Sequence, residues 1–227
     1  MEVSVIIPVH NAEKYIGRAI RSALDQNFDK NKFEVIVVND ASTDNTSKIL
    51  DYYSNRIKII NLKEKKGLAY ARNEGIRASS GRYTALLDAD DFMYNDLLYI
   101  ESSYLNLNPQ WDAVSCDYMI VNEHEEHIER KNGEEAPIAC GMMFRVERLI
   151  DIGLYDPKFE ANEEKDLRLR LEKKNYSIKN IELPLYRYRK HSTNLTNNIT
   201  KMKKYDKLLK EKHNIKTKKK SKIKKKK

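Results

Sequence analysis

The 227-residue sequence contains no long apolar run. Its longest apolar stretches, such as residues 5–7 and 83–87, are far shorter than the roughly 20 residues that a membrane-spanning helix needs. The N-terminus leads from Met1 and Glu2 directly into a strand-like segment, without the basic region and cleavage site of a secretory signal. These two absences predict a cytoplasmic protein, and they leave peripheral contact with the inner face of a membrane open.

Cysteine and glycine are both scarce. Cys116 and Cys140 have no second Cys or His at metal-binding spacing, which predicts two buried thiols in a reducing compartment. The turn after the first strand-like run, residues 8–12, contains no glycine. The glycine-rich loops of dinucleotide-binding and Walker-type sites are therefore excluded. A bound nucleotide would have to be held by carboxylates and a metal ion instead.

Charge is divided unevenly along the chain. The formal net charge is +9, but residues 201–227 hold 15 lysines and only two acids, so residues 1–200 carry 28 basic and 32 acidic side chains. The body is mildly acidic, and the composition of residues 201–227 predicts a disordered basic tail. Its lysines could solvate the chain or attach it to an anionic membrane surface. Nucleic-acid binding is disfavoured because the run lacks arginine and interleaved aromatics.

Strand-like and helical patterns alternate over the first hundred residues, which is typical of a parallel α/β sheet. Strands are expected at residues 2–9, 33–38, 57–62 and 83–87, with helices after Asn11 as N-cap, after Asp44 and from Gly67. Further strands at 111–121 and 138–144 flank a polar excursion at 122–135, and their pairing is expected to be antiparallel or mixed. Helices at 145–152 and 164–175 and strands at 176–181 and 185–188 complete the expected order.

Three aspartates follow the fourth predicted strand as Asp88-Ala89-Asp90-Asp91. Because alternate residues of an extended chain share a face, Asp88 and Asp90 can converge on one target while Asp91 points elsewhere. Open α/β sheets bind ligands at this carboxyl edge, and Mg²⁺ or Mn²⁺ is typically held by one or two carboxylates plus substrate phosphates. The pair therefore predicts a metal site. Alternatively, Asp90 or Asp91 caps the helix expected near Asn95.

Four motifs together resemble a known family. They are Pro8-Val9-His10-Asn11, residues 37–44, residues 67–73 and residues 88–91, and their order and spacing are similar to those of family 2 glycosyltransferases with the GT-A fold. The match continues at 141–145, 163–167 and 186–191, and so covers residues 3–195. The resemblance implies one Rossmann-like domain at 1–200, with a mixed, mostly parallel sheet flanked by helices. Residues 1–95 would form its nucleotide-sugar-binding half and 96–200 its acceptor-binding half, followed by the lysine-rich tail at 201–227.

The same resemblance implies an activity. It points to an inverting enzyme that transfers a sugar from a nucleotide-diphosphate sugar, with a UDP-sugar favoured, to a hydroxyl of a saccharide or lipid-linked acceptor. Synthesis of polysaccharide or cell-envelope glycan is the corresponding process. The implied cofactor is Mg²⁺ or Mn²⁺, which would act as a Lewis acid on the departing nucleoside diphosphate.

The resemblance also implies residue roles. The nucleotide-sugar would be contacted by Pro8, Val9, His10, Asn11, Asp40, Arg72, Asp88 and Ala89, and the metal by Asp90, Asp88 and His191. Asp40 would accept a hydrogen bond from the nucleobase, and Arg72 would face the nucleotide. Without the resemblance, Asp40 could instead form a turn, Arg72 could lie at the surface and His191 could be an ordinary packed residue.

A base must take the proton of the acceptor hydroxyl, and the family places it in the second acid of a Glu-Asp pair just before a helix. Here that position is Glu164, preceded by Glu163, so glutamate replaces aspartate and either carboxylate could serve. Two adjacent acids repel each other's charge, which should raise the pKa of one of them. Alternatively, both acids merely complement the positive end of the helix dipole.

A second function is compatible with the same residues. A non-catalytic protein that binds a nucleotide-sugar or a polyanion, tethered by its lysine tail, would bind the donor without releasing nucleoside diphosphate. Nucleotidyl transfer is disfavoured because the glycine-rich N-terminal loop of such enzymes is absent.

Overall fold

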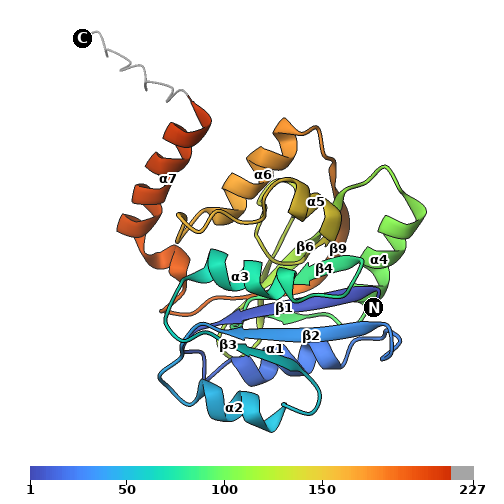
Figure 1. The fold of residues 1–227 in the computed structure, drawn as a ribbon, viewed down its shortest axis with the longest axis vertical. Helices are drawn as coiled ribbons and strands as arrows, with labels where there is room; N and C mark the ends of the chain where they lie inside the picture. The colour runs from blue at the N-terminus through green and yellow to red at the C-terminus, as the bar shows by residue number, and fades with distance from the viewer. Residues whose placement is uncertain (216–227) are drawn as a thin grey trace.

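The computed structural model describes residues 1–215. In this part of the chain nine strands form one mixed sheet in the order β3-β2-β1-β4-β8-β6-β9-β5, with β7 paired outside this path to β6 (Figure 1). The strands are β1 (Val3–Val9), β2 (Phe33–Asn39), β3 (Lys58–Asn61), β4 (Tyr83–Leu86), β5 (Phe92–Met93), β6 (Ala113–Val121), β7 (His127–Lys131), β8 (Met142–Arg145) and β9 (Ile178–Arg189). The α-helices are α1 (Ile16–Leu24), α2 (Thr46–Tyr52), α3 (Leu68–Arg77), α4 (Leu97–Leu107), α5 (Val146–Asp151), α6 (Glu163–Lys173) and α7 (Ile199–His213).

The N-terminal half has the parallel α/β arrangement that its sequence pattern predicts. β1 lies between β2 and β4, parallel to both, with Val3 opposite Phe33 on one side and Tyr83 on the other. Every residue of β1 is buried, as expected for a strand covered on both faces. Helices α1 and α2 lie on one side of these strands and α3 on the other (Figure 1). The strand order therefore reverses between β1 and β4, and ligands bind at the carboxyl ends of strands at such a point.

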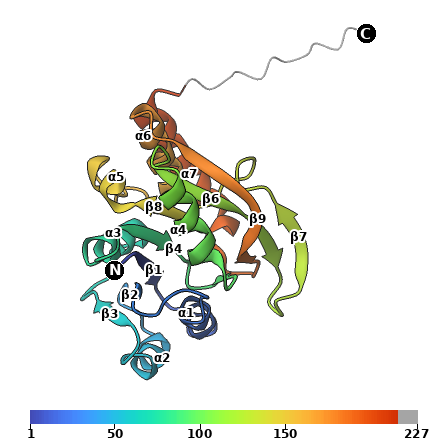
Figure 2. The same ribbon diagram turned by 90° about the vertical axis from the view of Figure 1, so that its right-hand side faces the viewer.

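The C-terminal half extends the same sheet with mixed pairing, as predicted. β8 is antiparallel to β4 and β6, whereas β9 is parallel to β6. The polar excursion contains β7, which forms a hairpin with β6 and stands apart from the rest of the sheet (Figure 2). The prediction of two separate strands at 176–181 and 185–188 is wrong, because β9 is one strand that continues through Pro184. The register shifts opposite Asp117, and proline is tolerated at such an irregularity.

Helix α7 corrects the expected start of the basic tail. We expected disorder from Lys201 onwards, but residues 199–213 form a helix. Tyr205 and Leu209 of α7 are buried against Phe159 and Ala161 in a small core that is separate from the main one. The lysine run at 216–227 lies outside the described residues.

Three smaller expectations can be compared with the structure. Both cysteines are free and buried, as predicted. The alternative that Asp90 or Asp91 caps a helix is wrong, because α4 has Asp96 at its N-cap position. Within residues 1–215 none of the helices combines the length and apolar character required to cross a bilayer.

Candidate active site

One pocket of about 790 Å³ lies at the carboxyl ends of β1, β2 and β4, and we refer to it as the main pocket. All the residues predicted for the site line it: Pro8, Val9, His10, Asn11, Asp40, Arg72, Asp88, Ala89, Asp90, Glu163, Glu164 and His191. Further lining comes from segments 137–140, 157–165 and 191–202. The fold therefore gathers the predicted residues from both halves of the chain around one volume.

The turns after β1 and β2 are tied together at the edge of this pocket. Nδ1 of His10 lies 2.7 Å from the carbonyl oxygen of Asp40. Asn11 has left-handed backbone geometry (φ 51°), and its Oδ1 accepts a hydrogen bond of 2.7 Å from the backbone N–H of Thr43. The expectation that Asn11 caps the first helix is wrong, because α1 begins only at Ile16. Asn11 instead fixes the turn that carries the predicted base-binding residues.

Asp40 is buried and binds a distant loop. Its Oδ1 accepts from the backbone N–H of Lys66 at 2.6 Å and its Oδ2 from that of Gly67 at 2.8 Å. Gly67 has a φ of 91°, a conformation that glycine adopts readily. These contacts span 26 and 27 positions, so the carboxylate of Asp40 shapes this loop and not its own turn. A contact between Asp40 and a nucleobase stays a prediction.

The three aspartates that follow β4 diverge as their alternation predicts. Asp88 and Asp90 both line the main pocket, with 27% and 30% of their side chains exposed. Asp91 is buried, and it accepts hydrogen bonds from the Tyr186 hydroxyl (2.8 Å) and the Arg189 backbone N–H (2.7 Å). Burial, with the nearby charges of Asp90 and Asp88, raises the pKa of Asp91 well above its usual value. Asp91 therefore belongs to the scaffold behind the pocket.

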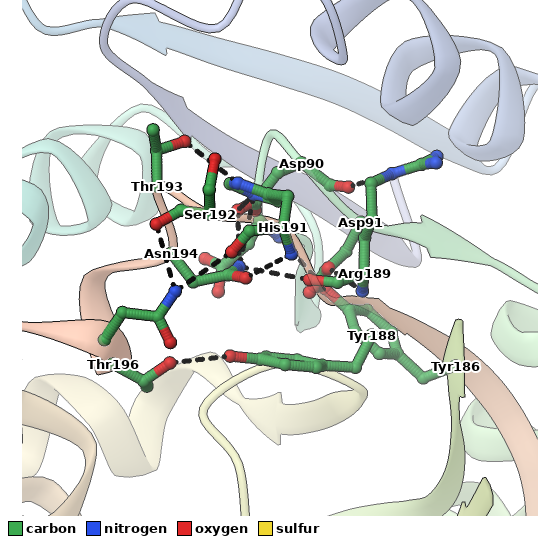
Figure 3. A network of polar contacts seen from close by, with 12 residues as sticks. Asp90, Asp91, Tyr186, Tyr188, Arg189, His191, Ser192, Thr193, Asn194 and Thr196 are labelled. Carbon is green, nitrogen blue, oxygen red and sulfur yellow. Dashed lines mark hydrogen bonds and ion pairs between the residues drawn. The ribbon is translucent and has the colours of Figure 1, made fainter. Parts of the chain in front are cut away.

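His191 lies against Asp90 at the end of β9 (Figure 3). Its Nε2 is 2.8 Å from Oδ2 of Asp90, and its Nδ1 is 2.9 Å from Oγ1 of Thr193. The ring stacks on Tyr15 with centroids 4.7 Å apart, and the backbone N–H of His191 donates to Oδ1 of Asn194 at 2.6 Å. Contacts on every side thus orient the imidazole toward the carboxylate of Asp90.

The predicted set of three metal ligands is only partly assembled. Asp88 accepts a hydrogen bond from Arg72 at 2.9 Å and takes no part in the contact between Asp90 and His191. Among residues 1–215, no group of three or more His, Cys, Asp or Glu side chains is arranged to hold a metal ion. One carboxylate and one imidazole are nevertheless donors that suit Mn²⁺. Such an ion would need oxygen donors from a bound ligand to complete its coordination.

Arg72 connects the two sides of the main pocket. Its guanidinium is only 1% exposed and pairs with Asp88 through Nη2 and with Glu163 through Nη1, the latter at 2.6 Å. These two carboxylates raise the pKa of Arg72 against the opposing effect of burial, which is the larger single influence. The alternative of a surface arginine is wrong. The side chain is instead a buried link between the turn after β4 and the start of α6.

The two glutamates at the start of α6 differ in their surroundings. Glu163 is buried, and its carboxylate is bound to Arg72. Glu164 is partly exposed to the main pocket, and its pKa is raised to about 7. Burial is the main cause, and the neighbouring charge of Glu163 adds to it while Arg72 and Lys165 oppose it. The expected rise in the pKa of one acid is therefore found, and it falls on Glu164.

Sequence reasoning missed several residues that line the main pocket. Tyr15 stacks on His191, and the side chain of Asn194 approaches both Asp90 and His191. Lys201 and Met202 come from α7, where the lysine content concealed the helix. A signal was present for α7, because Met202, Tyr205 and Leu209 recur at helical spacing. No comparable pattern marked Tyr15 or Asn194.

A comparison with protein families finds a match over residues 4–152, to the family described as "Glycosyl transferase family 2". Two curated relatives are TuaG of Bacillus subtilis, a putative teichuronic acid biosynthesis glycosyltransferase, and TarS of Staphylococcus aureus, a poly(ribitol-phosphate) beta-N-acetylglucosaminyltransferase. TuaG is 43% identical over 42% of this chain and 38% of its own length. TarS is 34% identical over 47% of this chain and 19% of its own length. Less than half of each relative is therefore matched.

Two solved structures have the same fold. TarS from S. aureus in complex with UDP-GlcNAc has a TM-score of 0.75 at 22% identity, over 87% of this chain and 61% of that chain. The mannosyltransferase PcManGT from Pyrobaculum calidifontis, in complex with GDP-Man and Mn²⁺, has a TM-score of 0.68 at 20% identity, over 85% of this chain and 58% of that chain. At these identities the similarity shows the fold, which is the GT-A arrangement that the motifs predict.

Proposed function

We propose a function that proceeds from one premise: the chain belongs to glycosyl transferase family 2. It transfers a sugar from a nucleotide-diphosphate sugar to a hydroxyl of a saccharide or lipid-linked acceptor, with inversion at the anomeric carbon. A UDP-sugar is the favoured donor, in keeping with the UDP-GlcNAc bound to TarS. The observation that carries the proposal is that the main pocket combines Asp90 and His191 with a glutamate whose pKa is about 7.

On the donor side, different residues of the proposed site would contact the nucleobase, the diphosphate and the metal ion. The tied turns that carry His10 and Asn11 give the nucleobase a fixed wall. Lys65 and Lys66 also line the pocket, and Lys65 would supply positive charge to a diphosphate, whereas Lys66 pairs with Glu64. Asp90 and His191 would hold Mg²⁺ or Mn²⁺ together with diphosphate oxygens. When bound, such an ion supplies Lewis-acid stabilisation of the charge on the departing diphosphate.

On the acceptor side, Glu164 is the proposed base. The acceptor oxygen forms a bond to the anomeric carbon from the face opposite the diphosphate, and its proton passes to the Glu164 carboxylate. The bond between the anomeric carbon and the diphosphate oxygen breaks, and its electron pair leaves with the nucleoside diphosphate. Glu163 is unsuited to the role because Arg72 already binds its carboxylate. A base with a pKa near the working pH is efficient in this kind of proton transfer.

Thermal shift with a panel of nucleotide sugars tests this function. A donor that binds only the folded protein raises its melting temperature, by about 5–10 °C at a hundredfold excess over its Kd. We expect a UDP-sugar with Mn²⁺ to give the largest rise, and nucleoside diphosphate to appear when an acceptor is added. Stabilisation without any release of nucleoside diphosphate would support the non-catalytic binding protein instead. A panel in which every nucleotide sugar leaves the melting temperature unchanged would contradict both the transferase and a non-catalytic protein that binds a nucleotide-sugar.

The pKa of Glu164 predicts the pH dependence of transfer. Below about pH 7 the carboxyl group is protonated and cannot accept the proton of the acceptor hydroxyl. We therefore expect kcat to rise through pH 7, and to fall about tenfold for each pH unit below pH 6. Replacing Glu163 with glutamine removes a charge that raises the pKa of Glu164. The acid limb of the pH–rate profile, where kcat falls, should therefore move to lower pH. An acid limb near pH 4.5 in the unaltered protein would contradict the assignment.

Peripheral attachment to an anionic membrane stays part of the proposal. The run at 216–227, outside the described residues, is rich in lysine, and each lysine near acidic lipid contributes about 1 kcal/mol of binding energy. A lipid-linked acceptor would lie at the same surface, which supports placing the two together. The attachment would determine where the protein acts. The lysine run that would provide it begins after α7, which ends at His213.

A further inference from the structure

The first turn of α6 is held from two directions. On one side, Glu163 is bound by Arg72 of α3 at 2.6 Å. On the other, the buried carboxylate of Asp166 is bound by α7, through Nζ of Lys212 at 2.6 Å and Nε2 of His213 at 2.8 Å. Glu164 lies in the sequence between these two anchored acids. Its place relative to the main pocket therefore depends on both attachments.

Helix α7 also binds the segment that leads into α6. Lys212 contacts Asp156 at 2.8 Å, and Lys201 contacts Glu160 at 3.0 Å. Between these two ion pairs, the small apolar core of α7 covers Phe159. Asp156, Glu160 and Asp166 are thus matched by cations spaced along α7. This complementarity accounts for lysines that sequence composition assigned to a solvated tail.

The same helix forms part of the wall of the main pocket. Lys201 and Met202 line it, together with the segment from Pro157 to Lys165. A displacement of α7 would therefore do two things at once. It would release the attachment at Asp166, and it would open the pocket to water beside Glu164.

We propose that α7 positions Glu164 for proton transfer and that Asp166 is the positioning residue through which it acts. The inference rests on the proposed function in one respect, that Glu164 is the base. A buried carboxylate with several charged partners fixes geometry when its hydrogen bonds are satisfied, and Asp166 is bound by Arg170 as well as by α7. Small misplacements of a reacting group can cost about 100-fold in rate, so such a support matters for catalysis.

Two lysines of α7 provide a matched test. Lys212 contacts Asp166 and Asp156, whereas Lys207 is 80% exposed and, within residues 1–215, forms an ion pair only with Glu211 of its own helix, at 3.7 Å. Hydrogen–deuterium exchange of the full chain without any ligand compares Lys212→Ala with Lys207→Ala. We expect amides at 160–168 to exchange about tenfold faster in Lys212→Ala and at the wild-type rate in Lys207→Ala. Amides of β1 and β2 should not change in either variant. Equal exchange at 160–168 in the two variants would overturn the inference.

Kinetics separate positioning from mere stability. With a donor identified by thermal shift, Lys212→Ala should lower kcat about 10- to 100-fold, with an unchanged KM for the donor. The acid limb of its pH–rate profile should move to lower pH, because a loosened α7 lets water reach Glu164. Lys212→Arg should restore both kcat and the pH profile. If exchange quickens while kcat and the pH profile stay at wild-type values, α7 does not position Glu164. Failure of the proposed function is a separate result, because it appears in the wild-type protein, either as no stabilisation by any donor or as stabilisation without release of nucleoside diphosphate.

Discussion

Replacing Glu164 with glutamine is expected to lower kcat by about 100- to 10,000-fold while donor affinity stays at its wild-type value. The amide has nearly the shape of the carboxylic acid but cannot take the proton of an acceptor hydroxyl. Glu164 makes no ion pair with the described residues, so its replacement leaves no charged side chain without its partner. Rapid-quench assays of nucleoside diphosphate release, with donor binding measured in parallel, provide the two readouts.

Glu163→Gln is the matched control for this variant. It changes the adjacent residue in the same chemical way, but it removes one of the two carboxylates that bind the buried Arg72. We expect it to lose about 3 kcal/mol of stability, the low end of the cost of breaking a buried ion pair, because Arg72 keeps its second carboxylate partner, Asp88. At a temperature where it is folded, it should still transfer sugar, at a reduced rate because one of the two attachments of the first turn of α6 is lost. If Glu164→Gln transferred sugar normally and folded Glu163→Gln did not, Glu163 would be the base.

Replacing Asp90 with asparagine is expected to abolish the part of donor binding that depends on a divalent metal. Asp90 is the carboxylate in contact with His191, and an amide oxygen is a much weaker ligand for Mn²⁺ than a carboxylate. With the unaltered protein, the rise in melting temperature with a UDP-sugar should be about 5–10 °C larger with Mn²⁺ than with a chelator. In Asp90→Asn the two conditions should give the same rise.

Asp96→Asn is the control for the aspartate substitution. Asp96 lies six positions further along the chain, at the N-cap position of α4, and does not line the main pocket. This variant should keep the full effect of Mn²⁺ on donor binding. Retention of that effect in Asp90→Asn would show that the carboxylate of Asp90 does not bind the metal, and Asp88 would be the next candidate.

The sequence predicted the parallel core well because local and global signals agree there. β1 and β2 are rich in valine and isoleucine, and each is followed by a polar turn. β9 was divided in two because Pro184 and the polar residue Glu182 break its pattern, and only the register shift against β6 shows how the strand continues. α7 was missed because the high lysine content of the segment outweighed the helical spacing of its apolar residues.

The candidate site was predicted residue by residue, but its internal contacts were not. Motif spacing indicated that Arg72, Asp88 and Glu163 belong to one site, and all three line the main pocket. Their ion pairs join residues 16 and 91 positions apart, and no local pattern encodes such pairing. For the same reason, adjacency alone could not decide between Glu163 and Glu164. That distinction depends on which of the two carboxylates the guanidinium of Arg72 binds.

The residues that line the main pocket are synthesised at different times, and this order has a consequence for the nascent chain. Strands β1 to β4 leave the ribosome first and can pair early, whereas Lys201 and Met202 follow more than a hundred residues later. The raised pKa of Glu164 comes mainly from burial, and Glu164 lines the same pocket as these late residues. A partly synthesised chain is therefore expected to form most of the proposed nucleotide side before the proposed acceptor side is complete.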